Sequence, residues 1–258
     1  MSLLFTVANG VAVITLDRPQ VHNAFDDALI AALTRAYERA IEDPAVHAIL
    51  LRASGKNFCA GADLNWMRRM AGYSRHENLA DAMALGQLMH TIDTAPKPTL
   101  VRIQGSAFAG ATGLIAASDI AVCASDSEFA VTEVRLGIIP AVISPYLVRA
   151  MGARQARRYF LTAERFSAET ARALGLVHEV VPAEELDEAI ERHLKALRAG
   201  SPAAIAAAKA LVAAVDRPVD LTVVQDTARR IADQRASADG KEGIAAFLEK
   251  RKPKWGTP

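Results

Sequence analysis

Short apolar runs alternate with longer stretches of helical spacing along the chain, up to about residue 140. The runs are rich in β-branched residues or bounded by Gly, Pro and Asp, which is typical of buried strands. The predicted strands are Val11–Leu16, residues 46–51, Thr99–Ile103, residues 119–124 and residues 128–131. The predicted helices are residues 26–41, Leu64–Met70 and residues 76–92. Asp26 or Asp27 is expected to cap the first of them. This alternation predicts an α/β fold with mostly buried strands.

The remainder of the chain, from Ser144 onward, is patterned mainly for helix and is interrupted by one apolar run at residues 176–181. The pair Ser201 and Pro202 is a typical N-cap and first helical residue. Two or three amphipathic helices follow it, up to about Phe247. We therefore expect a core domain at residues 1–199 and a C-terminal helical region at residues 200–258 that mediates oligomerisation.

Composition and charge narrow the classes of partner. The chain has 258 residues and a formal net charge of +1, from 30 basic and 29 acidic residues, so it has no overall attraction to nucleic acid or a membrane surface. Two cysteines are too few for a disulfide framework. The start of the sequence lacks the pattern of a signal peptide, and the longest uncharged run, residues 103–118, is too short to span a bilayer. We expect a cytoplasmic protein.

A loop between two glycines, Gly55 and Gly61, ends where a helix is predicted to begin, near Asp63 or Leu64. The first residues of a helix present unpaired N–H groups and the positive end of the helix dipole. Small side chains in the Ala-Gly-Ala run leave the backbone accessible. This pattern indicates an amide donor at Ala62 for an anion or a polarised carbonyl, or else only a tight connection between loop and helix.

A second stretch of small residues runs from Gly105 to Gly113 and is interrupted only by Phe108. Gly110 precedes a helical segment, so its amide is expected to point out of a helix N-terminus, as that of Ala62 would. Two such amides that converge on one oxygen form an oxyanion hole. Close packing of helices is the structural alternative. A dinucleotide-binding loop is a weaker interpretation, because the glycine spacing does not fit G-x-G-x-x-G.

Glu133 lies in the sequence FAVTEVRLGIIP, where apolar residues surround it on both sides. A carboxylate in apolar surroundings is partly desolvated, which favours its neutral form and suits general acid–base catalysis. The alternative is an ion pair with Arg135 or another cation.

Other chemistry is not indicated. The six histidines show no metal-ligand spacing, so no metal is predicted. Cys59 has no identifiable partner base and is expected to be a small buried hydrophobe. A G-x-S-x-G nucleophile motif is absent from the sequence.

Several motifs in a fixed order resemble one known family. They are RPQVHNAF, FCAGADL, G-x-A-x-x-G from Gly105, E-x-x-L-G-x-x-P from Glu133, A-x-x-L-G-L-V from Ala171, and GIAAFLEKRKP near the end. Together they are similar to the crotonase superfamily of enoyl-CoA hydratases and isomerases. The resemblance implies a crotonase-like spiral of ββα repeats, followed by a helical trimerisation region. It also implies a homotrimer or a dimer of trimers.

The resemblance assigns roles to particular residues. It implies that the N–H groups of Ala62 and Gly110 hold a thioester oxygen while Glu133 transfers protons. Coenzyme A would be part of the substrate, and no separate cofactor is implied. The positions matching the substrate and CoA path are Ala60, Ala62, Asp63, Leu64, Asn65, Gly110, Gly113, Phe247 and Lys250. The last two match a tail that approaches the CoA phosphates, often from a neighbouring subunit.

Gly113 departs from the family pattern. Hydratases of this superfamily commonly carry two glutamates, and Gly113 stands at the position of the first, so this chain has one. Ala141 and Val142 also replace a glycine-rich turn. We expect the space at Gly113 to hold water or a branched acyl group. The single acid fits hydration of an α,β-unsaturated acyl-CoA or isomerisation of a double bond.

The segments GADLNWMRRM, EVRLGIIPAVISPY and ARRYFLTAERF are most similar to a methylglutaconyl-CoA hydratase branch of the superfamily. This favours hydration of a branched substrate, in leucine degradation or fatty acid metabolism. If the acyl group carries a second carboxylate, Arg69, Arg75 and His76 are candidates to bind it. A CoA-binding or RNA-binding protein without turnover is the alternative of another class. Glu133 and the balanced charge argue against it.

Overall fold

A six-stranded sheet forms the centre of the computed structural model, which describes residues 2–255. Its order is β1-β2-β3-β4-β6-β9, with β1 antiparallel to β2 and the other pairs parallel. The strands are β1 (Leu3–Ala8), β2 (Val11–Leu16), β3 (Ala48–Ala53), β4 (Thr99–Ile103), β6 (Ile120–Ala124) and β9 (Glu179–Val181). The central strands are buried, as expected from their continuous apolar runs.

A second, three-stranded sheet contains β5 (Ser106–Phe108), β7 (Glu128–Ala130) and β8 (Phe166–Ser167). Strands β5 and β7 are parallel, and β8 is antiparallel to β7. This small sheet matters for function because the helical segments that follow β5 and β7 begin at the same edge.

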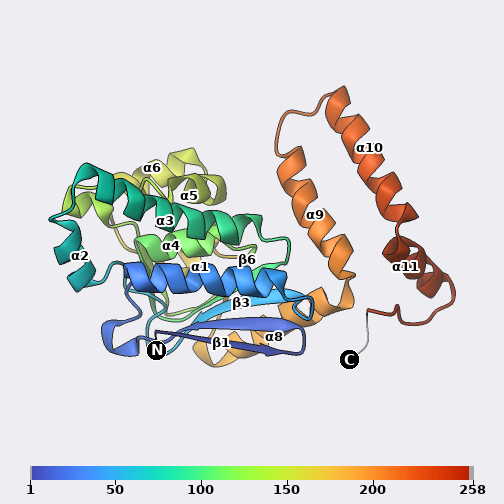
Figure 1. Cartoon of the computed structure of the whole chain (residues 1–258), viewed down its shortest axis with the longest axis horizontal. Coiled ribbons are helices and arrows are strands. Elements are labelled where there is room, and N and C mark those ends of the chain that lie inside the picture. The colour runs from blue at the N-terminus through green and yellow to red at the C-terminus, as the bar shows by residue number, and fades with distance from the viewer. Residues whose placement is uncertain (1, 256–258) are drawn as a thin grey trace. The chain divides into compact units, whose positions relative to one another are not determined.

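Helices connect the strands. They are α1 (Asp27–Glu42), α2 (Leu64–Met70), α3 (Arg75–Thr94), α4 (Gly110–Ala117), α5 (Ser144–Met151), α6 (Ala153–Thr162) and α7 (Ala168–Ala173), with the 3-10 turns η1 (Pro19–Val21) and η2 (Glu133–Leu136). Helix α1 begins where Asp26 accepts a hydrogen bond from the Leu29 N–H, which resolves the choice between Asp26 and Asp27. Its apolar face, including Leu33 and Tyr37, is fully buried. Helices α1 and α3 pack against each other (Figure 1).

The predicted α/β fold and the helical C-terminal part are confirmed, with two differences in detail. Strands β1, β5 and β8 were not expected. Strand β1 was missed although its sequence LLFTVA is apolar, whereas β5 and β8 have only three and two residues and leave no apolar run. Residues 176–181 form a strand only from Glu179, because the preceding residues belong to the turn that leaves α7.

The described chain separates into two compact units. The first comprises the residues up to Ala95 together with Thr99–Ile190, and the second comprises Pro96–Pro98 and the residues from Glu191 onward. The division falls within α8 (Leu186–Ala199), after the short turn η3 (Ala183–Glu185). A domain boundary at residues 199 and 200 stays a prediction.

The second unit contains α9 (Pro202–Val215), α10 (Leu221–Ala236) and α11 (Ala238–Leu248). Ser201 accepts a hydrogen bond from the Ala204 N–H, so the predicted N-cap is confirmed. Within residues 2–255 no single helix combines the length and apolar composition needed to cross a membrane. The consecutive segments Ala183–Ala199 and Pro202–Val215 meet those criteria only as a bent pair.

Candidate active site

Three backbone segments, which contain Cys59, Ala107 and Phe129, run parallel to one another and pair at these residues. Cys59 forms a parallel bridge with Ala107 of β5. Ala107 in turn pairs with Phe129 of β7 in a parallel register. The Cys59 N–H donates to the Ser106 carbonyl at 3.1 Å, and the Phe108 N–H donates to the Cys59 carbonyl at 3.0 Å. Residues that lie the same number of positions after Cys59, Ala107 and Phe129 are therefore expected at the same edge of the three segments.

The three residues predicted to carry the chemistry all emerge at this edge. Ala62 lies three positions after the bridging residue of its segment, Gly110 lies three positions after that of β5, and Glu133 lies four positions after that of β7. The topology thus brings together positions that are far apart in the sequence.

The backbone of Ala62 is fixed by Phe25. The Phe25 N–H donates to the Gly61 carbonyl at 2.7 Å, and the Asp63 N–H donates to the Phe25 carbonyl at 2.6 Å. Because Phe25 bonds to the residues on either side of Ala62, the N–H of Ala62 itself points the opposite way. That N–H has no hydrogen-bond acceptor among residues 2–255, so it is available to a ligand.

The amide of Gly110 is free for a different reason, because it belongs to the first residue of α4. The N-cap residue Ala109 makes no side-chain cap, and its own N–H donates to the Ala130 carbonyl at 2.8 Å. The Gly110 N–H has no acceptor within the described chain. It therefore carries the positive end of the helix dipole toward whatever lies in front of it.

Ala109 adopts a strained backbone conformation, with φ 50° and ψ −123°. Glycine is normally preferred here, and a side chain with this geometry costs free energy. The strain is maintained by the ladder bond to Ala130 and by the hydrogen bond from the Thr112 N–H to the Ala109 carbonyl at 2.9 Å. Such strain is typical of functional segments.

Glycine is needed at position 61 for its backbone conformation and at position 110 for close contact with Phe25. A Cβ at Gly61, whose φ is +98°, would lie 3.5 Å from the Ala109 Cβ. A Cβ at Gly110 would lie 3.3 Å from Cε2 of Phe25. Phe25 thus contacts both segments, one through its main chain and the other through its ring.

Asp63 positions the Ala62 segment from the other side. Its Oδ1 accepts from the N–H groups of Asn65 at 2.8 Å and Trp66 at 3.2 Å, and its Oδ2 accepts from Nη2 of Arg18 at 3.0 Å. Burial alone would raise the pKa of Asp63, but these backbone donors and the guanidinium together hold it below its ordinary value. Arg18 also pairs with Asp26 at 2.7 Å, so one guanidinium joins the N-caps of α1 and α2.

Glu133 is the first residue of η2 and is partly buried. Its Oε2 is buried and has no hydrogen-bond partner among the described residues. Burial raises the pKa of the Glu133 carboxyl, although backbone N–H groups at Glu133 and Thr132 oppose the shift. An ion pair with Arg135 is not formed, and that side chain is exposed. A partly buried carboxyl group with a raised pKa suits general acid–base catalysis.

The open space that we expected beside Gly113 is filled by other side chains. A Cβ at Gly113 would lie 2.3 Å from Cγ2 of Ile143, 2.8 Å from its Cβ and 3.2 Å from Cε of Met89. Both Gly113 and Ile143 are buried. The expectation that water or a branched acyl group occupies this position is therefore wrong, because an isoleucine side chain fills it. Gly113 offers no open surface for direct contact with a substrate.

The other residues predicted near Ala62 lie on the exposed part of the same segment. Ala60 is exposed, and its N–H donates to the His22 carbonyl at 3.0 Å. Leu64 is 68 % exposed at the start of α2, and the Asn65 side chain accepts from Arg68 at 2.7 Å. These positions are accessible from outside, and their contact with CoA stays a prediction.

Phe247 and Lys250 belong to the second compact unit. Phe247 is 82 % exposed near the end of α11, and Lys250 is exposed with φ 54°. Their role in CoA binding stays a prediction.

The three candidates for a second substrate carboxylate differ. Arg69 pairs with Asp27 at 2.6 Å, whereas Arg75 and His76 are exposed at the start of α3. Cys59 is fully buried, as expected for a small hydrophobe, and burial raises the pKa of its thiol to about 12. No group of three or more His, Cys, Asp or Glu side chains within residues 2–255 is placed to hold a metal ion.

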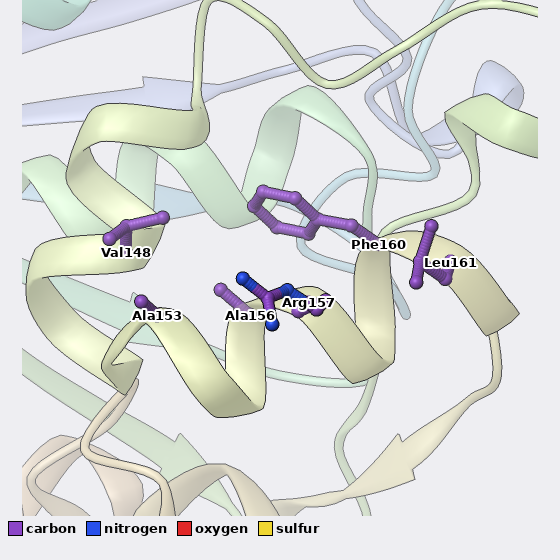
Figure 2. A pocket seen from close by; sticks show the side chains of 6 residues that line it. All are labelled: Val148, Ala153, Ala156, Arg157, Phe160 and Leu161. Carbon is purple, nitrogen blue, oxygen red and sulfur yellow. The ribbon is translucent and has the colours of Figure 1, made fainter.

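A separate cavity of about 260 Å³ lies beside α5 and α6 (Figure 2). Its lining is apolar apart from one guanidinium, and consists of Val148, Ala153, Ala156, Arg157, Phe160 and Leu161. It contains none of the predicted site residues.

Sequence reasoning missed three residues that shape the site: Phe25, Arg18 and Ile143. The first two lie in the motif RPQVHNAF, which contributed to the resemblance without being assigned a role. A main-chain bridge such as that between Phe25 and Ala62 leaves no trace in residue type. The packing role of Ile143 could be predicted only by considering it together with Gly113, which has no side chain.

Comparisons with known proteins agree on one group. The family model described as enoyl-CoA hydratase/isomerase matches residues 6–258. A crystal structure of an enoyl-CoA hydratase from Shewanella pealeana has 46 % sequence identity and a TM-score of 0.96, covering 99 % of this chain and 96 % of that one. An enoyl-CoA hydratase from Mycobacterium smegmatis has 36 % identity and a TM-score of 0.93, with both chains covered completely at 100 %.

A relative named for a different reaction is also similar. The trans-2-decenoyl-[acyl-carrier-protein] isomerase of Streptococcus mutans is 29 % identical over 260 residues, which cover 98 % of this chain and 97 % of the relative. The similarity therefore extends to proteins named for hydration and for isomerisation.

Proposed function

Because the chain belongs to the enoyl-CoA hydratase/isomerase family of the crotonase superfamily, we propose that it adds water to an α,β-unsaturated acyl-CoA. Membership also confirms the expected crotonase-like fold. The observation that supports the proposal most strongly is the register that brings two amides without acceptors, at Ala62 and Gly110, and the carboxyl of Glu133, whose Oε2 has no partner in the described chain, to one edge.

The two amides supply electrostatic stabilisation. Attack at Cβ of an unsaturated thioester moves negative charge onto the carbonyl oxygen and gives an enolate-like transition state. Fixed N–H donors at Ala62 and Gly110 stabilise that charge without reorganising, and each donor of this kind contributes about 3 kcal/mol. The glycines and alanines around them keep side chains out of the position that the oxygen takes.

Glu133 transfers the protons. Its carboxylate accepts a proton from water as the water oxygen forms a bond to Cβ. The carboxylic acid then returns that proton to Cα, so the net reaction is the addition of one water molecule and the carboxylate is regenerated. The raised pKa of Glu133 suits both halves of the cycle.

Isomerisation is the second candidate. It needs one group to move a proton between two carbons, and the described structure offers Glu133 while the position of Gly113 is packed with Ile143. The similarity to an isomerase of Streptococcus mutans also favours it. In this alternative Glu133 removes a proton from Cγ and returns it to Cα, or the reverse, and no water is added.

The identity of the acyl group is inferred only from the similarity of three segments to one branch of the superfamily. We propose a branched substrate such as 3-methylglutaconyl-CoA, which would place the reaction in leucine degradation. Its second carboxylate would need a cation, and Arg75 and His76 are better candidates than Arg69, which already pairs with Asp27. A homotrimer or a dimer of trimers, with Phe247 and Lys250 near the CoA phosphates, belongs to the same proposal.

Product analysis in deuterated water decides between the reactions. Crotonyl-CoA, 3-methylglutaconyl-CoA and a 3-enoyl-CoA are offered separately to the enzyme. Hydration predicts a 3-hydroxyacyl-CoA with deuterium at Cα. A shifted double bond without added water would support the isomerase instead. Binding without any product from the three thioesters would contradict both reactions and favour the non-catalytic class.

A further inference from the structure

Glu133 and Ile143 lie at opposite ends of one connecting segment. Glu133 begins η2, and Ile143 is the residue immediately before α5. Between them the chain is largely exposed, including Leu136, Ile138 and Ile139. The turn η2, which carries the acid, packs against α6, and the far end of the segment is held at Ile143.

The far end of this segment rests on two glycines. A Cβ at Gly86 of α3 would lie 3.9 Å from Cγ1 of Val142, which is ordinary contact. A Cβ at Gly113 of α4 would lie 2.3 Å from Cγ2 of Ile143, which is closer than real atoms approach. Ile143 is thus seated directly on the bare backbone of α4, and α4 and α5 pack together at this point.

The position on α4 is significant. Gly113 follows Gly110 by three residues, and residues at this spacing lie on the same face of a helix. The side chain of Ile143 therefore covers the helix face whose first residue presents the free amide. Ile143 thus occupies the place on that face that a longer, polar side chain at position 113 would take.

We propose that Ile143, by its contact with Gly113, is a positioning residue that anchors the far end of the segment carrying Glu133 and fills the position that a second acid at residue 113 would occupy. The proposal rests on the proposed function, because it concerns the acid of that reaction. It explains why Gly113 occurs together with a bulky residue at position 143, each of which would be unfavourable without the other.

Truncation of Ile143 tests the positioning role. Ile143→Ala removes Cγ2 and is expected to lower kcat about tenfold to a hundredfold, because small misplacements of a catalytic group are costly. It should leave KM nearly unchanged and move the acidic limb of the kcat/KM profile. The conservative Ile143→Val, which keeps the atoms that contact Gly113, should retain most of kcat. Gly86→Ala, beside the same segment, is the matched control for packing.

A merely structural contact would give a different result. It would lower the melting temperature of Ile143→Ala while kcat and the pH profile stayed at their wild-type values, and that outcome would overturn the proposal. Failure of the proposed function itself is seen separately, because wild-type enzyme would then give no product from any of the three thioesters.

A two-by-two comparison covers the case in which Ile143→Ala does not fold. Gly113→Ala should lower kcat, because its new Cβ displaces Ile143. Adding Ile143→Gly to that variant relieves the clash but also removes the positioning side chain, so the melting temperature should recover while kcat stays low. Gly113→Glu combined with Ile143→Gly should add a second ionisation to the pH profile of kcat/KM. Wild-type kinetics in Gly113→Ala, a wild-type kcat in the double variant that lacks the Ile143 side chain, or a profile with one ionisation in Gly113→Glu with Ile143→Gly would each contradict the proposal.

Discussion

Phe25 and Ala62 form a parallel bridge that turns the Ala62 N–H away from Phe25 and leaves it without an acceptor in the described chain. The same phenylalanine places its ring against Gly110, the residue with the second free amide. One side chain and its backbone thus set the separation of two donors that come from different parts of the sequence. The proposed oxyanion hole therefore consists of main-chain groups alone.

Removing the charge of Glu133 tests its role in turnover. Glu133→Gln is expected to lower kcat by about 10²–10⁴-fold, because proton transfer is lost while the shape is kept. Acyl-CoA affinity, measured by calorimetry, should change little. Arg135→Gln is the matched control, because Arg135 is exposed in the same turn and makes no pair with Glu133. Near-normal turnover in Glu133→Gln would remove this residue from the mechanism.

The raised pKa of Glu133 predicts the direction of two pH effects. Since the carboxylate is the base, kcat/KM should fall as pH decreases through a value above the ordinary 4.5. Since burial disfavours the ionised form, Glu133→Gln should melt at a higher temperature than wild type at about pH 8. The difference should vanish in acid, below the ordinary pKa, where both side chains are neutral. Equal melting temperatures at both pH values would contradict a desolvated carboxylate.

A methyl group at position 110 should disturb the oxyanion hole through Phe25. In Gly110→Ala the new Cβ lies 3.3 Å from Cε2 of Phe25, so the ring or the helix start must move. We expect kcat to fall about tenfold, and Phe25→Leu in the same chain to recover part of the loss. Gly86→Ala, whose Cβ meets nothing closer than 3.9 Å, is the matched control and should keep wild-type kcat. A fully active Gly110→Ala would show that the amide is not constrained.

The ion pair between Asp63 and Arg18 should contribute to stability in a pH-dependent way. Asp63→Asn keeps an acceptor for the N-terminus of α2 but removes the charge, at an expected cost of about 1–3 kcal/mol at neutral pH. Because the pKa of Asp63 is lowered in the folded state, its stabilisation is present above the ordinary 3.8 and is lost as pH falls through the folded pKa. Denaturation curves of the two proteins should therefore converge in strong acid. A constant difference at every pH would argue against the ion pair.

The alternation of strands and helices could be predicted from apolar spacing, because buried strands and helix faces leave periodic patterns. Glu133 could be singled out for the same reason, since a charge within an apolar run is conspicuous. Ala62 and Gly110 were suggested only by small residues at helix starts, and the family resemblance selected among the alternatives. What joins the three positions is the pairing of Cys59, Ala107 and Phe129, which depends on tertiary register.

The error at Gly113 has a clear physical cause. A missing side chain was taken as empty space, but protein interiors are close-packed and a neighbour fills such a position. Ile143 lies thirty residues further along the chain, and nothing in its local sequence shows that it returns to α4. Contacts of this kind can be found only when the two positions are considered together.

A structure of Glu133→Gln with an unsaturated acyl-CoA bound tests the central claim most directly. The account predicts that the main-chain nitrogens of Ala62 and Gly110 both lie about 2.7–3.1 Å from the thioester oxygen, with the side chain at position 133 facing Cα and Cβ. A thioester oxygen bound by neither nitrogen, or by only one of them, would contradict it.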